Sequence, residues 1–170
     1  MDADGGSLRR LTTEPGDDVA PSWSRDGRWI YFGSNRTGEH QVWRIPAEGG
    51  AAVQVTRNGG TYAEESPDGK FFFYTKARGT TPLWKVPLSE GIVSGPESQV
   101  AGAIGYLSFA VRPEGVYFNP GGSIEFVPFA GGAGGVTGGF SPTRWTFRTS
   151  SPSVLPQRLA GRRAAATRFG

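Results

Sequence analysis

The chain has 170 residues, with 27 glycines, 13 prolines, five tryptophans and no cysteine. Its length suits one domain, and the lack of cysteine excludes disulfides and thiolate metal sites. The net charge of +3 hides an uneven distribution, because residues 1–125 carry all 15 acidic and 12 basic residues, whereas residues 126–170 carry six arginines and no acid. The basic character therefore belongs to the C-terminal part of the chain.

The chain shows no pattern of a targeting or membrane-spanning segment. Residues 1–4 read Met-Asp-Ala-Asp, without the basic and apolar regions of a secretory signal. No run approaches the ~18 apolar residues that a membrane span needs. We therefore expect neither a secretory signal in these residues nor a transmembrane helix.

Two turn motifs recur at a fixed spacing. Asp26-Gly27 returns 42 residues later as Asp68-Gly69, and the acidic-Gly-Gly triplet of residues 4–6 returns 44 residues later at residues 48–50. A period of about 40–45 residues is typical of propeller blades, each a sheet of four strands. We interpret Asp26, Gly27, Asp68 and Gly69 as structural turn residues, since Asp bonds nearby backbone N–H groups and Gly adopts positive φ.

The period divides the chain into blades. Residues 1–15 are interpreted as the end of a preceding blade and residues 16–60 as blade one. Each predicted strand of blade one is rich in aromatic or β-branched residues and is bounded by turn residues. These strands are 20–24, 29–33, 41–46 and 52–56.

The later blades repeat this pattern with decreasing fidelity. Blade two, residues 61–102, has predicted strands at 70–75, 82–87 and 98–101. Blade three, residues 103–139, is degenerate, with strands predicted at 107–111, 116–118 and 124–129. Residues 140–148 are interpreted as the start of a fourth blade. Residues 149–170 contain Ser, Pro, Arg and Ala without a period, which predicts an Arg-rich disordered tail.

The predicted fold is therefore all-β: a partial β-propeller of about three four-stranded antiparallel blades. Closed propellers have typically ~4–8 blades, and stacking of neighbours buries the faces of each sheet. Three blades do not close, so we expect an open arc or a fragment of a longer protein. Its exposed blade edges favour oligomerisation, aggregation or a binding partner.

The most distinctive stretch resembles a known repeat. Residues 21–27 read Pro-Ser-Trp-Ser-Arg-Asp-Gly, and residues 34–36 read Ser-Asn-Arg. This is similar to the WD40-like repeat of the TolB family, often called PD40, whose usual core is Pro-x-Trp-Ser-Pro-Asp-Gly, a strand, and Ser-x-Arg. Arg25 stands where the family commonly has proline, whereas the second repeat has Pro67 and lacks the tryptophan. The resemblance covers roughly residues 2–130.

The resemblance implies a β-propeller that serves as a binding platform. Such propellers occur in periplasmic TolB-type proteins, in regulators that carry a separate DNA-binding or kinase domain, and ahead of the hydrolase domain of prolyl-oligopeptidase-like peptidases. Our leading hypothesis is a non-catalytic module that binds a protein or peptide. The alternatives are the sensor portion of a transcriptional regulator or kinase, and the gating propeller of a peptidase.

Candidate interaction residues lie in and around the first inner strand. Asp17 and Asp18 precede it, where the channel mouth of a propeller is expected, and Trp23 lies within it. Arg36 is expected to pair with an acidic turn residue. Nucleic acid is expected to contact the chain only non-specifically, through the Arg-rich tail.

The sequence predicts no catalytic, cofactor or metal site. His40 is the single histidine and lies in a repeat turn, and no Gly-x-Ser-x-Gly nucleophile elbow is present. Glu64 and Glu65 are adjacent, so in a strand they point to opposite faces; we interpret them as a solvated strand end. Residues 2–6 begin in the manner of a calcium loop, but no glutamate follows at the twelfth position of such a loop. The glycines of residues 131–139 lack a phosphate-loop pattern.

Overall fold

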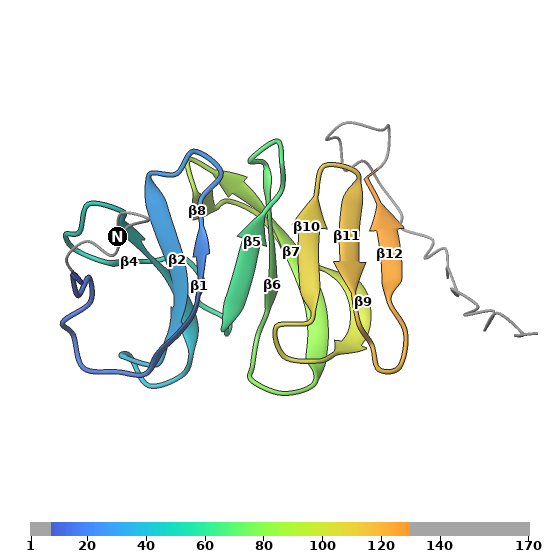
Figure 1. Cartoon of the computed structure of the whole chain (residues 1–170), viewed down its shortest axis with the longest axis horizontal. Helices are drawn as coiled ribbons and strands as arrows, with labels where there is room; N and C mark the ends of the chain where they lie inside the picture. The colour runs from blue at the N-terminus through green and yellow to red at the C-terminus, as the bar shows by residue number, and fades with distance from the viewer. Residues whose placement is uncertain (1–7, 130–170) are drawn as a thin grey trace, which may run out of the picture.

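The computed structural model describes residues 8–129, which form twelve strands in three antiparallel sheets. The sheets stand side by side in chain order, as Figure 1 shows. The first sheet contains β1 (Asp18–Trp23), β2 (Trp29–Ser34), β3 (Gln41–Pro46) and β4 (Val53–Gln54), in that order. The predicted all-β fold of three open sheets is confirmed.

The second and third sheets follow the same up-and-down path. The second contains β5 (Tyr62–Glu65), β6 (Phe71–Thr75), β7 (Thr81–Ser89), β8 (Ile92–Val93) and β9 (Ser98–Ile104), with both β8 and β9 paired to β7. The third contains β10 (Phe109–Arg112), β11 (Gly115–Phe118) and β12 (Glu125–Pro128). The first strands of the three sheets, β1, β5 and β10, are neighbours in space.

The two Asp-Gly turns have the same construction. Asp26 accepts hydrogen bonds from the Ser24 hydroxyl at 2.7 Å and from the Arg28 amide at 3.0 Å, and Gly27 has φ +69°. In the second sheet, Asp68 accepts from Ser66 at 2.5 Å and from the Lys70 amide at 3.1 Å, and Gly69 has φ +70°. Both glycines occupy the left-handed region, where a side chain is strained.

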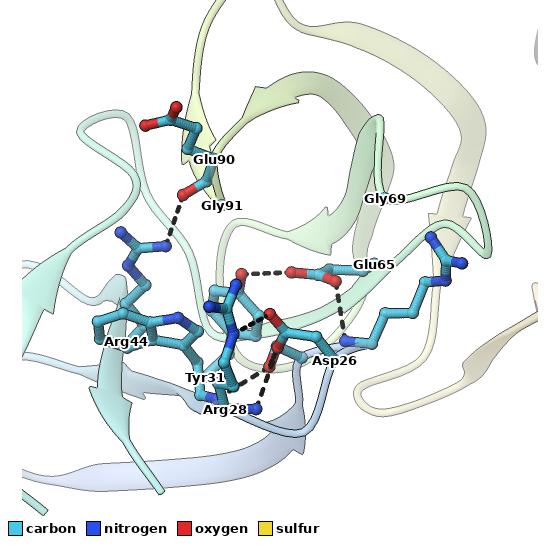
Figure 2. Close-up of a pocket in the computed structure, with 11 residues that line it drawn as sticks. Asp26, Arg28, Tyr31, Arg44, Glu65, Gly69, Glu90 and Gly91 are labelled. Atoms are coloured by element: carbon cyan, nitrogen blue, oxygen red, sulfur yellow. Dashed lines mark hydrogen bonds and ion pairs between the residues drawn. The ribbon is translucent and has the colours of Figure 1, made fainter.

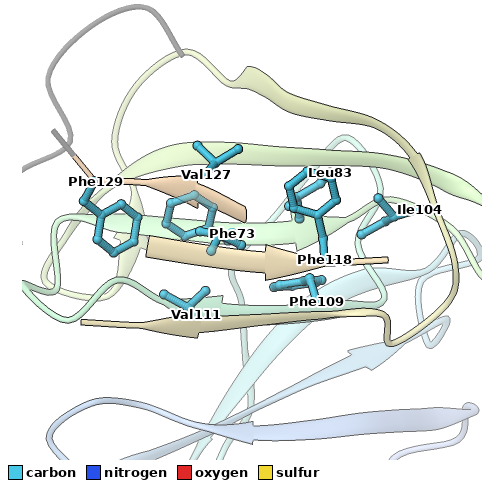
Figure 3. Packing of buried hydrophobic residues seen from close by; sticks show 9 residues of the cluster. Phe73, Leu83, Ile104, Phe109, Val111, Phe118, Val127 and Phe129 are labelled. Atoms are coloured by element: carbon cyan, nitrogen blue, oxygen red, sulfur yellow. The ribbon is translucent and has the colours of Figure 1, made fainter. Parts of the chain in front are cut away.

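The second sheet is buried on both faces. Phe72, Phe73, Tyr74 and Thr75 are all buried, although successive side chains of a strand point to opposite faces. Phe72 and Tyr74 pack into a cluster with the first sheet. Phe73 packs the other way, into a cluster with the third sheet (Figure 3). The consecutive aromatic residues of β6 therefore hold both neighbouring sheets.

The predicted strands differ from the structure mainly at their ends. β3 has the predicted bounds, but β1 begins at Asp18 because Ala20, with φ +51°, forms an irregularity that lets the pairing with β2 continue. β7 continues to Ser89 and turns back into β8, a hairpin that the sequence did not predict. Leu107 has φ +56° and lies outside β10, contrary to the strand predicted from residue 107.

Several predictions lie outside the described residues. These are the acidic-Gly-Gly turn of residues 4–6, the glycine cluster of residues 131–139, the fourth blade at residues 140–148 and the tail at residues 149–170. Within residues 8–129, no helix is long and apolar enough to cross a membrane.

Candidate functional site

The four predicted interaction residues lie at two opposite ends of the first sheet. Where β1 begins, Arg36 donates two hydrogen bonds to the Asp18 carboxylate at 3.0 and 3.2 Å, and Asp17 forms an ion pair with Arg78 of the second sheet at 2.9 Å. Trp23 lies where β1 ends, and 62% of its surface is exposed. The structure therefore brings Asp17, Asp18 and Arg36 together but places Trp23 apart from them.

Arg36 is engaged within the first sheet. Its guanidinium lies 5.1 Å from the ring of Phe32 and 4.9 Å from the ring of Trp43, and its side chain is only 8% exposed. Burial disfavours the charged form of Asp18, but hydrogen bonds from Ser34, Thr12 and Arg36 outweigh this effect and lower its pKa. This end of the sheet is thus held by internal contacts.

The opposite end contains a cavity of about 660 Å³ between the first and second sheets (Figure 2). We call it the inter-sheet cavity. The first sheet contributes residues from the turn after β1 and from β2 and β3, and the second contributes the end of β5 and the turns after β5 and β7. The lining residues are Ser24, Arg25, Asp26, Arg28, Trp29, Tyr31, Arg44, Glu65, Gly69, Glu90 and Gly91.

Two carboxylates of the cavity already have partners. Asp26 pairs with the Arg28 guanidinium at 2.5 Å, and hydrogen bonds from the Arg28 amide, the Ser24 hydroxyl and the Arg28 side chain lower its pKa to about 2. Glu65 accepts from the Tyr31 hydroxyl at 2.5 Å and from the Arg25 amide at 2.9 Å. Burial, with the hydrogen bond to Glu65, raises the pKa of Tyr31. Tyr31 is therefore a neutral hydrogen-bond donor at physiological pH.

Arg44 is a buried cation in the wall of the cavity. It is 8% exposed, its Nη1 donates to the Glu90 carbonyl at 2.9 Å, and its guanidinium lies 4.2 Å from the ring of Trp29. Its buried Nε has no hydrogen-bond partner, and no carboxylate of residues 8–129 forms an ion pair with it. A side chain at Gly91 would clash with Nη1, so this glycine allows the second sheet to approach Arg44 closely.

A second hollow, of about 390 Å³, crosses the inner strands of all three sheets. We call it the inner-strand groove. Trp23 lies in it, and it shares Arg25 and Glu65 with the inter-sheet cavity. The remaining lining residues are Pro21, Ser22, Tyr62, Glu64, Ser66, Pro67, Val111, Arg112 and Pro113.

Glu64 and Glu65 contact different neighbours. Glu64 accepts from the amide of Val111 in the third sheet at 2.8 Å and from the Tyr62 hydroxyl, whereas Glu65 contacts the first sheet. The prediction that they point to opposite faces is confirmed. The interpretation as a solvated strand end is wrong, because β5 lies between two other sheets and both side chains are half-buried.

The described part of the chain offers no cluster of metal-binding groups. Among residues 8–129, no three of the His, Asp and Glu side chains lie together in a way that could hold a metal ion. His40 lies in the loop before β3, at the end of the sheet opposite the cavity; it is half-buried and its Nε2 has no partner among these residues.

Comparison with known proteins identifies the family. The model of the PD40 family, described as the TolB beta propeller domain, matches residues 1–94, which is more than half of the chain. The chain belongs to the PD40 family. Among its relatives, an uncharacterized protein of Agrobacterium fabrum is 42% identical over 71 residues, which are 41% of this chain and 24% of that protein. The Tol-Pal system protein TolB of Bordetella pertussis is 43% identical over 53 residues, or 31% of this chain and 12% of TolB.

A solved structure supports the same fold. The crystal structure of TolB from Acinetobacter baumannii matches with a TM-score of 0.55 at 18% identity, over 78% of this chain and 35% of that one. This likeness shows the fold alone: the three sheets are arranged as blades of a β-propeller, and residues 8–129 do not close it. The chain spans a quarter or less of the length of the curated relatives it matches.

In this PD40 propeller, sequence reasoning singled out Asp26, Glu65 and Gly69 for other reasons but missed Arg44, Glu90 and Gly91 of the cavity. Arg44 occupies a strand position that alternation alone does not distinguish, and Glu90-Gly91 lies in the unpredicted hairpin between β7 and β8. The sequence does contain one signal, the glycine at position 91 directly after Glu90. In the structure both residues have positive φ and form the two-residue turn between β7 and β8. Such a turn favours glycine and predicts a hairpin.

Proposed function

We propose that this PD40 propeller is a non-catalytic module that binds a protein or peptide in the inner-strand groove. The observation that carries the proposal is the exposed Trp23, a large apolar side chain at the end of an inner strand. It lies in a hollow whose other members include Tyr62 and the charged Glu64 and Arg112. An exposed aromatic residue surrounded by polar groups is typical of the centre of a protein interface.

The groove suits an extended segment of another chain. It crosses the ends of β1, β5 and β10, which are the inner strands of neighbouring blades and which surround the axis in a closed propeller. The Arg112 side chain is 58% exposed, so its guanidinium remains accessible to an acidic or carbonyl group even though it lies 4.0 Å from the Glu64 carboxylate. Trp23 supplies apolar contact area, and the charged groups supply orientation.

The non-catalytic part of the proposal rests on how the groove's acidic groups are used. Glu64 and Glu65 each accept hydrogen bonds that hold neighbouring sheets, and His40 lies at the opposite end of the first sheet. A general base must reach the proton that it abstracts. Carboxylates that are already held in contacts between sheets are poorly placed to do this. The Bordetella relative is named a Tol-Pal system protein, and we propose by analogy that this chain also acts by contacting another protein.

The test is a selection of binders from a random peptide library on the immobilised chain, followed by affinity measurement by fluorescence anisotropy. Trp23→Ala is expected to weaken the selected peptides by about 2 kcal/mol, the level of an interface hot spot. Ile92→Ala, an exposed apolar residue on β8 outside the groove, is the matched control and should leave affinity unchanged. Equal affinity for both variants, no selectable peptide, or cleavage of the peptide in mass spectra would refute the proposal.

A further inference from the structure

We propose that the inter-sheet cavity binds a small, singly charged carboxylate ligand through Arg44 and Arg25. This inference does not rest on peptide binding in the groove. The inter-sheet cavity lies between the first two sheets, among the turns that follow β1, β5 and β7, and Trp23 does not line it. It follows from the unpaired arginines of the cavity, the burial of Arg44 and the volume of the cavity.

Two of the three arginines that line the cavity have no ion-pair partner among the described residues. Arg25, Arg28 and Arg44 line it, and of these only Arg28 forms an ion pair within residues 8–129. The Glu65 carboxylate is used by a hydroxyl and a backbone amide. Glu90 contacts Arg44 through its backbone carbonyl, and Figure 2 shows its carboxylate directed away from Arg44. Three arginines and three acidic residues thus line the cavity, but Arg25 and Arg44 form no ion pair within residues 8–129.

The burial of Arg44 makes the absence of an ion pair costly. A buried guanidinium is stable only when its charge and its N–H groups are compensated. Arg44 has one bond to a carbonyl, a side-chain contact with the Tyr31 hydroxyl and one ring contact, while its buried Nε–H has no partner among the described residues. An anion placed beside it would supply the missing compensation.

The position of Arg44 is fixed before any ligand arrives. The Trp29 ring supports one face of the guanidinium, and the Glu90 carbonyl holds Nη1. A side chain at position 91 would clash with Nη1, so glycine is required there for this arrangement. A guanidinium held in this way presents its planar N–H fork without further loss of side-chain freedom, which favours bidentate binding of a carboxylate.

Charge and volume select the ligand class. A single carboxylate would match one unpaired guanidinium, whereas a doubly charged phosphate would place a second negative charge beside Glu65. The volume of about 660 Å³ is in the range of small-molecule sites, ~300–1,000 Å³. Trp29 and Tyr31 add aromatic surface, so the carboxylate is expected to carry an apolar body.

The test is an NMR titration of the full, ¹⁵N-labelled chain with sodium phenylacetate at constant ionic strength. We expect saturable shifts at the Arg44 Nε–H and at the amides of Arg28 and Gly91. The neutral 2-phenylethanol and the dianionic phenyl phosphate should bind at least tenfold more weakly. Binding of either probe as tightly as phenylacetate would overturn the proposed ligand class.

The variants separate a site from a general charge effect. Arg44→Gln is expected to weaken phenylacetate at least tenfold, and the exposed Arg25→Gln keeps the test valid if the first variant does not fold. Arg57→Gln removes an exposed arginine at the far end of the sheet and is the matched control. Equal loss in Arg57→Gln and Arg25→Gln, or shifts that never saturate, would refute the site. Trp23→Ala should not change phenylacetate binding, which distinguishes failure of this proposal from failure of peptide binding.

Discussion

The two interfaces that flank the second sheet use different chemistry at equivalent positions. Tyr31 in the first sheet donates to Glu65 in the second at 2.5 Å. The equivalent of Tyr31 in the second sheet is Phe73, 42 residues later, and the equivalent of Glu65 in the third sheet is Val111, as the strand registers show. Phe73 and Val111 belong to one apolar cluster. A hydroxyl and a carboxylate in one interface are thus replaced together by two apolar side chains in the next.

The difference explains where the molecule is filled and where it is hollow. The second–third interface is closed by the rings of Phe73, Phe109 and Phe129, whose packing requires only matching shapes (Figure 3). The first–second interface is held at its edge by directional hydrogen bonds, and the inter-sheet cavity lies beside them. The polar contacts of the first–second interface therefore leave room for a ligand at its edge, while Phe72 and Tyr74 pack an apolar cluster in the same interface. The second–third interface is filled by aromatic rings and has one hydrogen bond of the same kind, from the Val111 amide to Glu64.

The largest expected effect comes from removing the central ring of the apolar interface. Phe73 has no exposed surface, so Phe73→Ala removes buried apolar area and leaves a cavity. The free energy of unfolding is expected to fall by about 3–5 kcal/mol, measured by urea denaturation followed by intrinsic fluorescence.

The control for this variant is Phe126→Ala, the same change on the other side of the third sheet. Phe126 is half-buried and packs on Tyr117 with a centroid distance of 4.6 Å. It should cost clearly less than Phe73→Ala. Equal costs would mean that the second–third interface is not the main apolar contact.

The polar interface should respond less strongly and in a coupled way. Glu65→Ala leaves the hydroxyl of Tyr31, which is 1% exposed, without its acceptor, and is expected to cost about 1–3 kcal/mol. Tyr31→Phe removes only the donor and should cost about 0.5–1.5 kcal/mol. The double variant should cost less than the sum, with a coupling of at least about 0.5 kcal/mol from urea denaturation of all four proteins.

Tyr117 offers the matched control for this cycle. It is the third equivalent of Tyr31, but its hydroxyl donates to Glu114 of its own sheet at 2.9 Å, in an exposed setting. Tyr117→Phe should change stability by less than about 0.5 kcal/mol, as exposed substitutions usually do. Additive costs for Tyr31 and Glu65 would show that their contact does not hold the two sheets together.

The sequence was sufficient for the parts of this comparison that depend on local spacing. The period between Asp26 and Asp68 predicts both turns, and strand patterning predicts β3 at its observed bounds. The pairing of Tyr31 with Glu65 was not predictable, because the two residues are 34 positions apart and meet only through the angle at which two sheets pack. Arg44 was missed for the same reason, since its burial depends on the hairpin of the neighbouring sheet.

The smallest expected effect is a change in the alkaline stability profile, and it distinguishes the two interfaces by titration. Burial, followed by hydrogen bonding to a glutamate, raises the pKa of Tyr31, Tyr62 and Tyr74. Because the folded protein holds these phenolic protons more tightly than the unfolded chain, their contribution to stability is complete below the unfolded pKa of about 10 and is lost as pH rises above it.

Stability measured by urea denaturation should therefore fall above about pH 10. Tyr31→Phe should make this fall shallower, since it removes one tyrosine with a raised pKa, the one that joins the first sheet to Glu65. An unchanged slope in Tyr31→Phe would mean that the Tyr31 hydroxyl is not buried against Glu65 in solution, and the proposed difference between the polar and apolar interfaces would be lost.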